Sequence, residues 1–170
     1  MFQYAYNVGK GTFYSGGASA IQDKIVEIAL DCLNHQNANS YGIVAHPGWC
    51  LAWVADVYAA AGAPVGGAGC ANCAGSYFGV STNWDEIPIG ACVYGYSSSP
   101  AGHVGIYVGN DKVIHNIGSV AEHSLDAWIS GWNGQCWGWE STEPILPEYP
   151  VHPGLMTGCG GKVGTCSRRR

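Results

Sequence analysis

The feature that most constrains the fold is the segment 103–116, which has the pattern of two strands joined by a tight turn. Residues 103–109 (His-Val-Gly-Ile-Tyr-Val-Gly) alternate in the manner of a strand. Asn110-Asp111 is a turn signal, and residues 112–116 (Lys-Val-Ile-His-Asn) have the composition of a returning strand. The segment therefore predicts an antiparallel hairpin with a histidine on each strand.

A second constraint is a cysteine at the start of a predicted helix. Gly48 breaks any secondary structure that precedes Cys50, and Gly62 ends the helical pattern that follows it. A thiol at a helix N-terminus feels the positive end of the helix dipole, which favours the reactive thiolate. Cys50 is therefore the candidate nucleophile, although an isolated cysteine is more often a small buried hydrophobe. The apolar positions expected on one helical face are Leu51, Val54, Ala55 and Tyr58.

A cysteine followed by a histidine at a strand start and a polar residue on the next strand is the layout of a papain-like nucleophile, base and orienting residue. His-Val-Gly-Ile-Tyr-Val-Gly followed by Val-Ile-His resembles the NlpC-type cell-wall cysteine peptidases, bacterial hydrolases that cut peptidoglycan stem peptides. The resemblance covers residues 20–140 and is strongest over 103–115. Tyr41-Gly42 and the run 88–90 (Pro-Ile-Gly) also sit where this family has similar residues.

The chain departs from that family around the nucleophile. The family usually has Asp-Cys-Ser-Gly there, whereas this chain has Trp49-Cys50-Leu51-Ala52, which is closer to the cysteine- and histidine-dependent amidohydrolase/peptidases (CHAP domains). The resemblance implies an α+β, papain-like fold in which the nucleophile helix packs on a small antiparallel sheet that presents the histidines.

The resemblance assigns Cys50 as nucleophile, His103 as general base and His115 as the residue that orients the base. A thiolate–imidazolium ion pair between Cys50 and His103 is the expected resting state, because each charge lowers the cost of the other. The backbone N–H of Cys50 is a candidate oxyanion donor. Tyr41 is a second donor, a substrate contact or a packing residue, and Trp49, beside the nucleophile, is expected to contact substrate.

Hairpin geometry leaves the third residue open. A two-residue turn at Asn110-Asp111 would pair Ile106 with His115, so that His115 would face away from His103 and Asn116 would share the face of His103. His115 can orient His103 only if the turn holds three residues or a β-bulge intervenes. Asn116 is therefore the alternative third residue. Glu122 and His123 are weaker candidates for this role.

Charge and composition narrow the class of partner. The net charge of −5 argues against nucleic acid. No apolar run is long enough to span a membrane, and residues 1–6 have neither the basic start nor the apolar core of a signal peptide. A wall hydrolase must still reach the wall, so the expected location is extracellular or in the cell wall, by a phage or a dedicated export route. Disulfides would suit that setting, and the further cysteines are Cys32, Cys70, Cys73, Cys92, Cys136, Cys159 and Cys166.

The rest of the chain fits one hydrolase domain over residues 1–143, followed by a Pro-, Gly- and Cys-rich tail over 144–170. The first helix is predicted to end near Asn34. Strands are predicted over 87–96 and 135–140, and a short helix or turn over 122–129. Residues 62–79 are expected to form an irregular insertion. The apolar face expected on the first helix is Ile21, Ile25, Ile28 and Cys32.

The sequence thus predicts a cysteine peptidase or amidase that hydrolyses peptidoglycan stem peptides through a thioester, with no cofactor and no metal site. The alternatives are a muramoyl-alanine amidase or cross-bridge peptidase of the CHAP type, an inactive wall-binding module, and an acyltransferase on the same fold.

Overall fold

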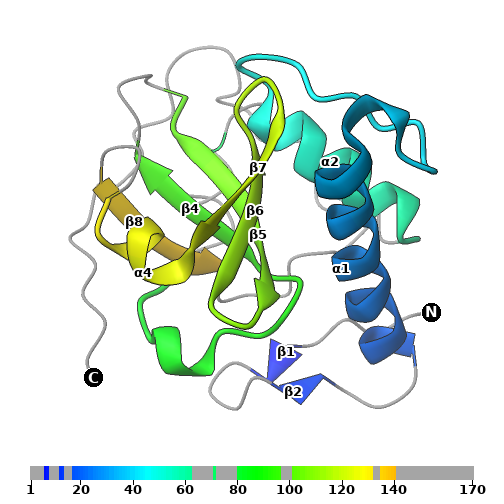
Figure 1. Cartoon of the computed structure of the whole chain (residues 1–170). Helices are drawn as coiled ribbons and strands as arrows, with labels where there is room; N and C mark the ends of the chain where they lie inside the picture. Colours follow the sequence, from blue (N-terminus) through cyan, green and yellow to red (C-terminus); the bar gives the residue numbers. More distant parts are fainter. Residues whose placement is uncertain are drawn as a thin grey trace, which may run out of the picture.

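The computed structural model describes residues 6–7, 12–13, 17–62, 71, 80–96, 101–131 and 135–140. These residues form an α+β fold in which helices lie on both sides of one antiparallel sheet (Figure 1). The elements are β1 (Tyr6–Asn7), β2 (Thr12–Phe13), α1 (Gly17–His35), η1 (Gln36–Ala38), α2 (Cys50–Ala60), β3 (Val80–Ser81), η2 (Trp84–Glu86), β4 (Cys92–Tyr96), β5 (His103–Gly109), β6 (Lys112–Asn116), β7 (Val120–Ser124), α4 (Leu125–Ile129) and β8 (Gln135–Glu140).

The main sheet has six strands in the order β3-β8-β4-β5-β6-β7, and every neighbouring pair is antiparallel. Strands β4 to β7 follow the chain as a meander, whereas β8 returns to the other edge of β4. Short β1 and β2 pair with each other in a separate two-stranded sheet. The α+β class and the antiparallel sheet predicted from the sequence are confirmed.

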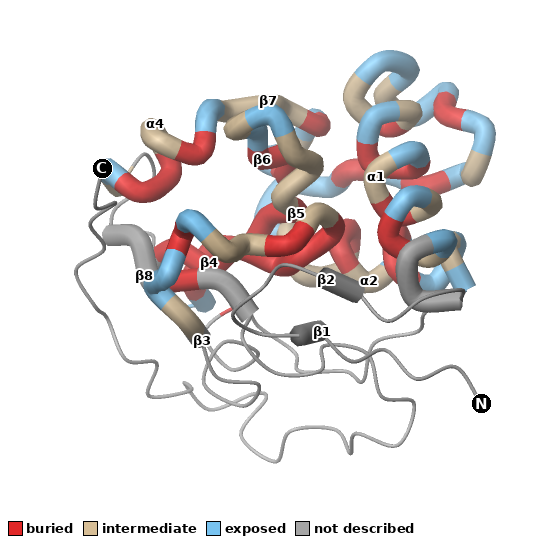
Figure 2. The backbone as a smooth tube through the Cα atoms, turned by 90° about the horizontal axis from the view of Figure 1, so that it is seen from below, coloured by how far each residue is buried: buried red, intermediate tan, exposed pale blue. Residues whose placement is uncertain are grey.

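Alternation along the strands produces an apolar core on each face of the sheet. Val104, Ile106 and Ile114 pack with buried residues of α1 and α2. Val113 points to the other face, where it packs with Leu125 and Trp128 of α4. The buried residues therefore run through the middle of the molecule, and the outer side of α1 carries exposed ones (Figure 2).

Helix α1 has the predicted apolar face. Ile25, Ile28 and Cys32 have no exposed surface, and Ile21 packs against the same core. The helix runs to His35, one residue beyond the predicted end at Asn34. Helix α2 begins at Cys50 as predicted.

The buried face of α2 differs in part from the prediction. Trp53, Val54, Val57 and Tyr58 are buried, while Leu51 and Ala55 are only partly covered. The helix is apolar nearly all round, so its apolar positions alone do not select one face. Packing against the sheet on one side and α1 on another selects the bulky Trp53 and Val57.

The β5–β6 hairpin contains the β-bulge on which the sequence analysis depended. Asn110 and Asp111 form a turn with positive φ angles of 49° and 61°. Gly109 pairs with Lys112, the register shifts between Tyr107 and Gly109, and His115 then lies opposite Gly105. The bulge adds one residue to β5, so His115 occupies the same face of the sheet as His103.

Two predictions of secondary structure need correction. Strand β4 begins at Cys92 rather than at residue 87, because residues 89–90 form a turn in which Gly90 has a φ of 81°. Residues 122–129 are not a single helix or turn. Val120–Ser124 form β7, which pairs with β6, and Ser124 then caps α4 by accepting a hydrogen bond from the Ala127 amide (3.1 Å).

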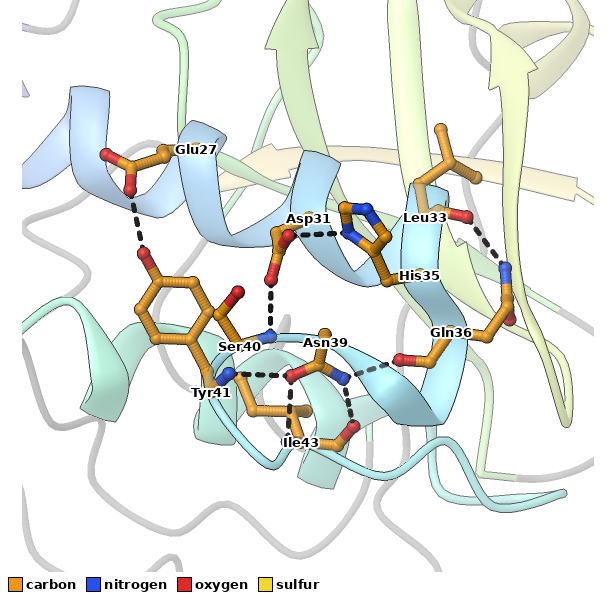
Figure 3. Close-up of polar contacts among 9 residues, drawn as sticks. All are labelled: Glu27, Asp31, Leu33, His35, Gln36, Asn39, Ser40, Tyr41 and Ile43. Atoms are coloured by element: carbon orange, nitrogen blue, oxygen red, sulfur yellow. Dashed lines mark hydrogen bonds and ion pairs between the residues drawn. The ribbon is translucent and has the colours of Figure 1, made fainter.

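The segment that leads from α1 to Cys50 is shaped by side chains that bind backbone groups (Figure 3). The Asn39 amide donates to the carbonyls of Gln36 and Ile43, and its Oδ1 accepts from the amides of Tyr41 and Ile43. Asp31 accepts from the Ser40 amide at 2.7 Å. These bonds provide partners for backbone groups that the irregular segment does not pair in a helix or strand.

The predicted tail over 144–170 and nearly all of the predicted insertion over 62–79 lie outside the described residues. Within the described ranges, none of the helices combines the length and the apolar character that a membrane span requires. The division into a domain over 1–143 and a tail therefore stays a prediction.

Gly105 is the residue that permits the observed hairpin packing. A Cβ atom there would lie 2.8 Å from Val113 Cγ1 and 3.0 Å from both the Ile114 carbonyl oxygen and His115 Cβ. We expect Gly105→Ala to lower the free energy of unfolding by about 1–3 kcal/mol, because the clash forces the two strands apart. Urea unfolding measures the change. Ser119→Ala, in an exposed turn, is the control and should stay within about 0.5 kcal/mol; an equally small effect of Gly105→Ala would contradict the close approach.

Candidate active site

Cys50 is the first residue of α2 and is partly buried against the core shared by α1, α2 and the sheet. The chain enters the helix through Gly48, whose φ of 77° is open mainly to glycine. Trp49, at the N-cap, has no side-chain acceptor for the first amides of the helix. The positive end of the helix dipole therefore acts directly on the Cys50 thiol and favours its thiolate.

Asn116 fixes the start of α2 to the end of β6. Its Nδ2 donates to the carbonyls of His46 (2.9 Å) and Trp49 (3.2 Å), and its Oδ1 accepts from the Gly118 amide (2.8 Å). Since β5 and β6 are antiparallel, the end of β6 lies beside the start of β5, where His103 stands. Cys50 and His103 therefore lie at the same end of the sheet. Cys50 packs with the core on the α1 and α2 face, whereas His103 stacks on Trp128 of α4 on the other face.

The structure brings His103 and His115 together. His103 Nε2 and His115 Nδ1 are 2.8 Å apart, and the ring centroids are 5.1 Å apart at an angle of 82°. This bond uses Nε2 of His103, and Nδ1 is the second nitrogen of that ring. Asn116, the alternative third residue, lies on the opposite face of the hairpin and binds the backbone before Cys50 instead.

A tryptophan covers the histidine pair. The indole of Trp128 on α4 stacks on His103 with centroids 5.5 Å apart and planes 28° apart, and it meets His115 edge-on at 5.3 Å. His103 and His115 are both buried. The indole Nε1 donates to the Tyr94 carbonyl of β4 at 3.4 Å, which holds the ring in place.

Burial determines the charge state of the pair. Burial, followed by the charge of His123, lowers the pKa of His103 to about 4. Burial, followed by the charges of His103 and His123, lowers the pKa of His115 to about 3. Both rings are therefore neutral near neutral pH. These surroundings oppose the imidazolium half of the expected ion pair and favour a neutral base that accepts the thiol proton during attack.

His123 is a third imidazole in contact with this pair. Its Nδ1 lies 2.7 Å from His115 Nε2, and it is partly exposed. From the sequence, His123 is only a weaker candidate for the orienting role, and residues 122–129 are expected to form a short helix or turn. Recognising Val120–Ser124 as a strand that pairs with β6 would have placed His123 opposite Val113, two residues from His115 and on the same face of the sheet.

Tyr41 and Trp49 differ in their surroundings. The Tyr41 hydroxyl donates to Glu27 of α1 at 2.7 Å (Figure 3). The Lys24 ammonium lies 5.3 Å from the centre of the Tyr41 ring. These contacts favour the packing alternative for Tyr41, because its proton is donated away from a substrate. Trp49 is 64% exposed directly before Cys50, a position suited to contact with a ligand.

Two other cysteines are core residues in the described part of the chain. Cys32 and Cys92 carry reduced thiols and are buried. Burial is the main reason that the pKa of Cys32 rises to about 11, and the Cys92 thiol donates to the Tyr58 hydroxyl at 3.3 Å. Cys70, Cys73, Cys159 and Cys166 lie outside the described residues, as does the side chain of Cys136.

Among the described residues, no group of three or more His, Cys, Asp and Glu side chains could hold a metal ion. The rings of His103, His115 and His123 bind one another in a row rather than converge on one point.

Comparisons with protein-family models and with curated proteins found no match to this chain. The site therefore has to be interpreted from its own geometry.

The first prediction concerns thiol reactivity. Iodoacetamide should modify Cys50 at least about tenfold faster than Cys32 or Cys92 in the folded protein, because alkylation needs an accessible thiolate. Mass spectrometry of the three peptides against time measures the rates. In urea the three rates should converge, and equal rates in the folded protein would contradict the assignment of Cys50 as the reactive thiol.

The second prediction concerns acid stability. The lowered pKa values of His103 and His115 mean that the unfolded chain binds more protons than the folded one below the ordinary histidine pKa. The free energy of unfolding should therefore fall as pH drops from 6.5 to 4, by up to about 1.4 kcal/mol per pH unit for each ring. Urea unfolding across this range measures the slope.

Glutamine variants provide the control for that slope. His103→Gln or His115→Gln should remove one ring's contribution to the slope of the free energy of unfolding against pH, because the amide does not titrate. A slope that is the same in the wild type and in both variants would show that these rings are not held neutral by burial.

Proposed function

We propose that this chain is a papain-like cysteine hydrolase that cleaves amide bonds in bacterial peptidoglycan stem peptides. The observation that carries the proposal is the bond of 2.8 Å between His103 Nε2 and His115 Nδ1, made possible by the bulge in β5. It fixes the orientation of a buried, neutral imidazole on the strand that begins at the end of the sheet where α2 also begins. A nucleophile, a base and a residue that holds the base are the parts of nucleophilic catalysis by a thiol.

The first half of the reaction forms a thioester. The Cys50 sulfur attacks the amide carbonyl carbon while its proton passes to Nδ1 of His103. Negative charge develops on the carbonyl oxygen, and the Cys50 backbone N–H at the helix N-terminus is the proposed donor that stabilises it. The proton on His103 then moves to the leaving nitrogen as the C–N bond breaks, which leaves the acyl group on sulfur.

The second half restores the enzyme. Water attacks the thioester carbonyl and gives a proton to His103, and the C–S bond breaks with return of that proton to the sulfur. His115 keeps the imidazole in one orientation in both halves. No step in this sequence needs a metal ion or a cofactor.

The substrate class is inferred from the resemblance of residues 103–115 to the NlpC-type peptidases, whose substrates are stem peptides. The exposed indole of Trp49 supports an extended or sugar-bearing substrate beside Cys50, since aromatic faces bind both. The proposal implies an extracellular or wall location, where peptidoglycan is found.

The test is digestion of purified peptidoglycan by the wild type and by Cys50→Ala, with Cys32→Ala as the control for loss of a different thiol. We expect new stem-peptide fragments from the wild type, a loss of at least about a thousandfold in Cys50→Ala, and retained activity in Cys32→Ala. Mass spectrometry of the fragments identifies the bond that is cut.

Other products would change the assignment. Cleavage at the muramoyl–alanine amide would favour the CHAP-type amidase, and transfer of the acyl group to an added amine would favour an acyltransferase. Wall binding without cleavage would favour a binding module, and equal cleavage by Cys50→Ala would contradict every cysteine-dependent version.

A further inference from the structure

Histidines 103, 115 and 123 form one continuous row. Nε2 of His103 meets Nδ1 of His115 at 2.8 Å, and Nε2 of His115 meets Nδ1 of His123 at 2.7 Å. The inner two rings are buried, whereas the outer ring is partly exposed. The same pair of atoms, Nε2 and Nδ1, makes both contacts, so the row has a direction.

A neutral imidazole carries one N–H and one acceptor nitrogen, so the protons in such a row depend on one another. If His123 Nδ1 accepts, His115 carries its proton on Nε2 and uses Nδ1 as acceptor. His103 then carries its proton on Nε2, and its Nδ1 is an acceptor. In this direction His103 is able to take the proton of a thiol.

Protonation of the outer ring reverses the row. A charged His123 has a proton on both nitrogens, so its Nδ1 must donate to His115 Nε2. His115 then carries its proton on Nδ1 and donates to His103 Nε2, which leaves the proton of His103 on Nδ1. In this direction His103 presents a donor where the thiol needs an acceptor.

We propose that His123 is a positioning residue whose acceptor nitrogen sets the direction of the row, keeps Nδ1 of His103 ready to accept the thiol proton, and withdraws that base in acid. This inference rests on the function proposed above, because it assigns His103 as the base for Cys50. His123 acts through His115 and touches neither the substrate nor the reacting atoms.

The elements packed against β7 carry other charged groups that could also produce a dependence on pH. Strand β6, helix α4 and helix α1 pack against it. Lys112 and Glu122 form an ion pair at 2.7 Å, and Asp31 pairs with His35 at 2.7 Å on α1. By strand alternation Lys112 and Glu122 lie on the face opposite His123. The charged residues of these elements, besides the row itself, are Lys112, Glu122, Asp126, Asp23, Lys24, Glu27, Asp31 and His35.

The charge of His123 reaches both inner rings. It contributes to the lowered pKa of His103 and of His115, after burial in each case. A proton on His123 and a proton on His103 therefore oppose each other electrostatically, in agreement with the hydrogen-bond argument.

Two variants of nearly equal size separate the acceptor from the shape of the side chain. In His123→Asn the amide oxygen takes the place of Nδ1 and accepts from His115, but it does not titrate. His123→Leu fills similar space and has no acceptor, so the N–H of the buried His115 loses its partner. Both are assayed in the full chain against purified peptidoglycan from pH 5 to pH 9, with Cys50→Ala as the inactive reference.

We expect His123→Asn to keep kcat within about threefold of the wild type at pH 8 and to lose the decline in kcat on acidification, since no proton can reverse the row. His123→Leu should lose about tenfold in kcat at pH 8 with little change in KM, because the direction of the row is no longer set. Equal behaviour of the Asn and Leu variants, or a wild-type acid decline in both, would overturn the proposal.

A second readout does not depend on substrate. Long-range ¹H–¹⁵N spectra of the histidine-labelled protein report which ring nitrogen carries the proton. At pH 8 Nδ1 of His103 should be unprotonated in the wild type and in His123→Asn. In acid it should gain a proton together with His123 in the wild type but stay unprotonated in His123→Asn. A proton on Nδ1 of His103 at pH 8 would overturn the proposal, even if cleavage fails and the proposed function is rejected separately.

Discussion

The site depends on the register of one hairpin. The extra residue in β5 lies between Tyr107 and Gly109, close to the turn. It decides which face of the sheet each paired residue occupies from there to the end of the hairpin away from the turn. Without it, His115 would point toward α2 and Asn116 would point toward α4. With it, His115 holds the imidazole of His103, and Asn116 holds the backbone before Cys50. One irregularity therefore assigns adjacent residues of β6 to two different tasks on opposite faces of the sheet.

Burying polar rings in an apolar layer needs hydrogen-bond partners for them, because an unpaired buried polar group costs about 1–3 kcal/mol. The histidine row meets this need internally, since each contact joins a nitrogen of one ring to a nitrogen of the next. The outermost of the three rings, His123, is partly exposed. Trp128 covers the two inner rings, which are buried, whereas His123 at the outer end is partly exposed.

Much of this arrangement was predictable from the sequence, and the rest shows where local patterns lose information. The alternation of residues 103–109, the Asn110-Asp111 turn and the apolar face of Ile25 and Ile28 gave the hairpin and α1 correctly. The need for a bulge followed from geometry, but its presence did not, because a bulge is set by packing between strands rather than by residue type.

Strand β7 and the buried face of α2 could not be found in this way. Val120-Ala121-Glu122-His123-Ser124 lacks the alternation of a half-buried strand, and its pairing with β6 is a tertiary effect. Because that strand was not predicted, the contact between His123 and His115 was not predicted either. The buried face of α2 contains Trp53 because the neighbouring elements determine which side of an all-apolar helix is buried.

The contact between Trp128 and the histidine row has an optical consequence. An indole stacked on an imidazole loses fluorescence when that ring gains a positive charge, and Trp128 touches both His103 and His115 while its Nε1 is anchored to β4. The protein thus carries its own fluorophore at the point where proton transfer is proposed. Emission from Trp128, isolated by replacing the other tryptophans with phenylalanine, would follow the charge of the base in real time without any added label.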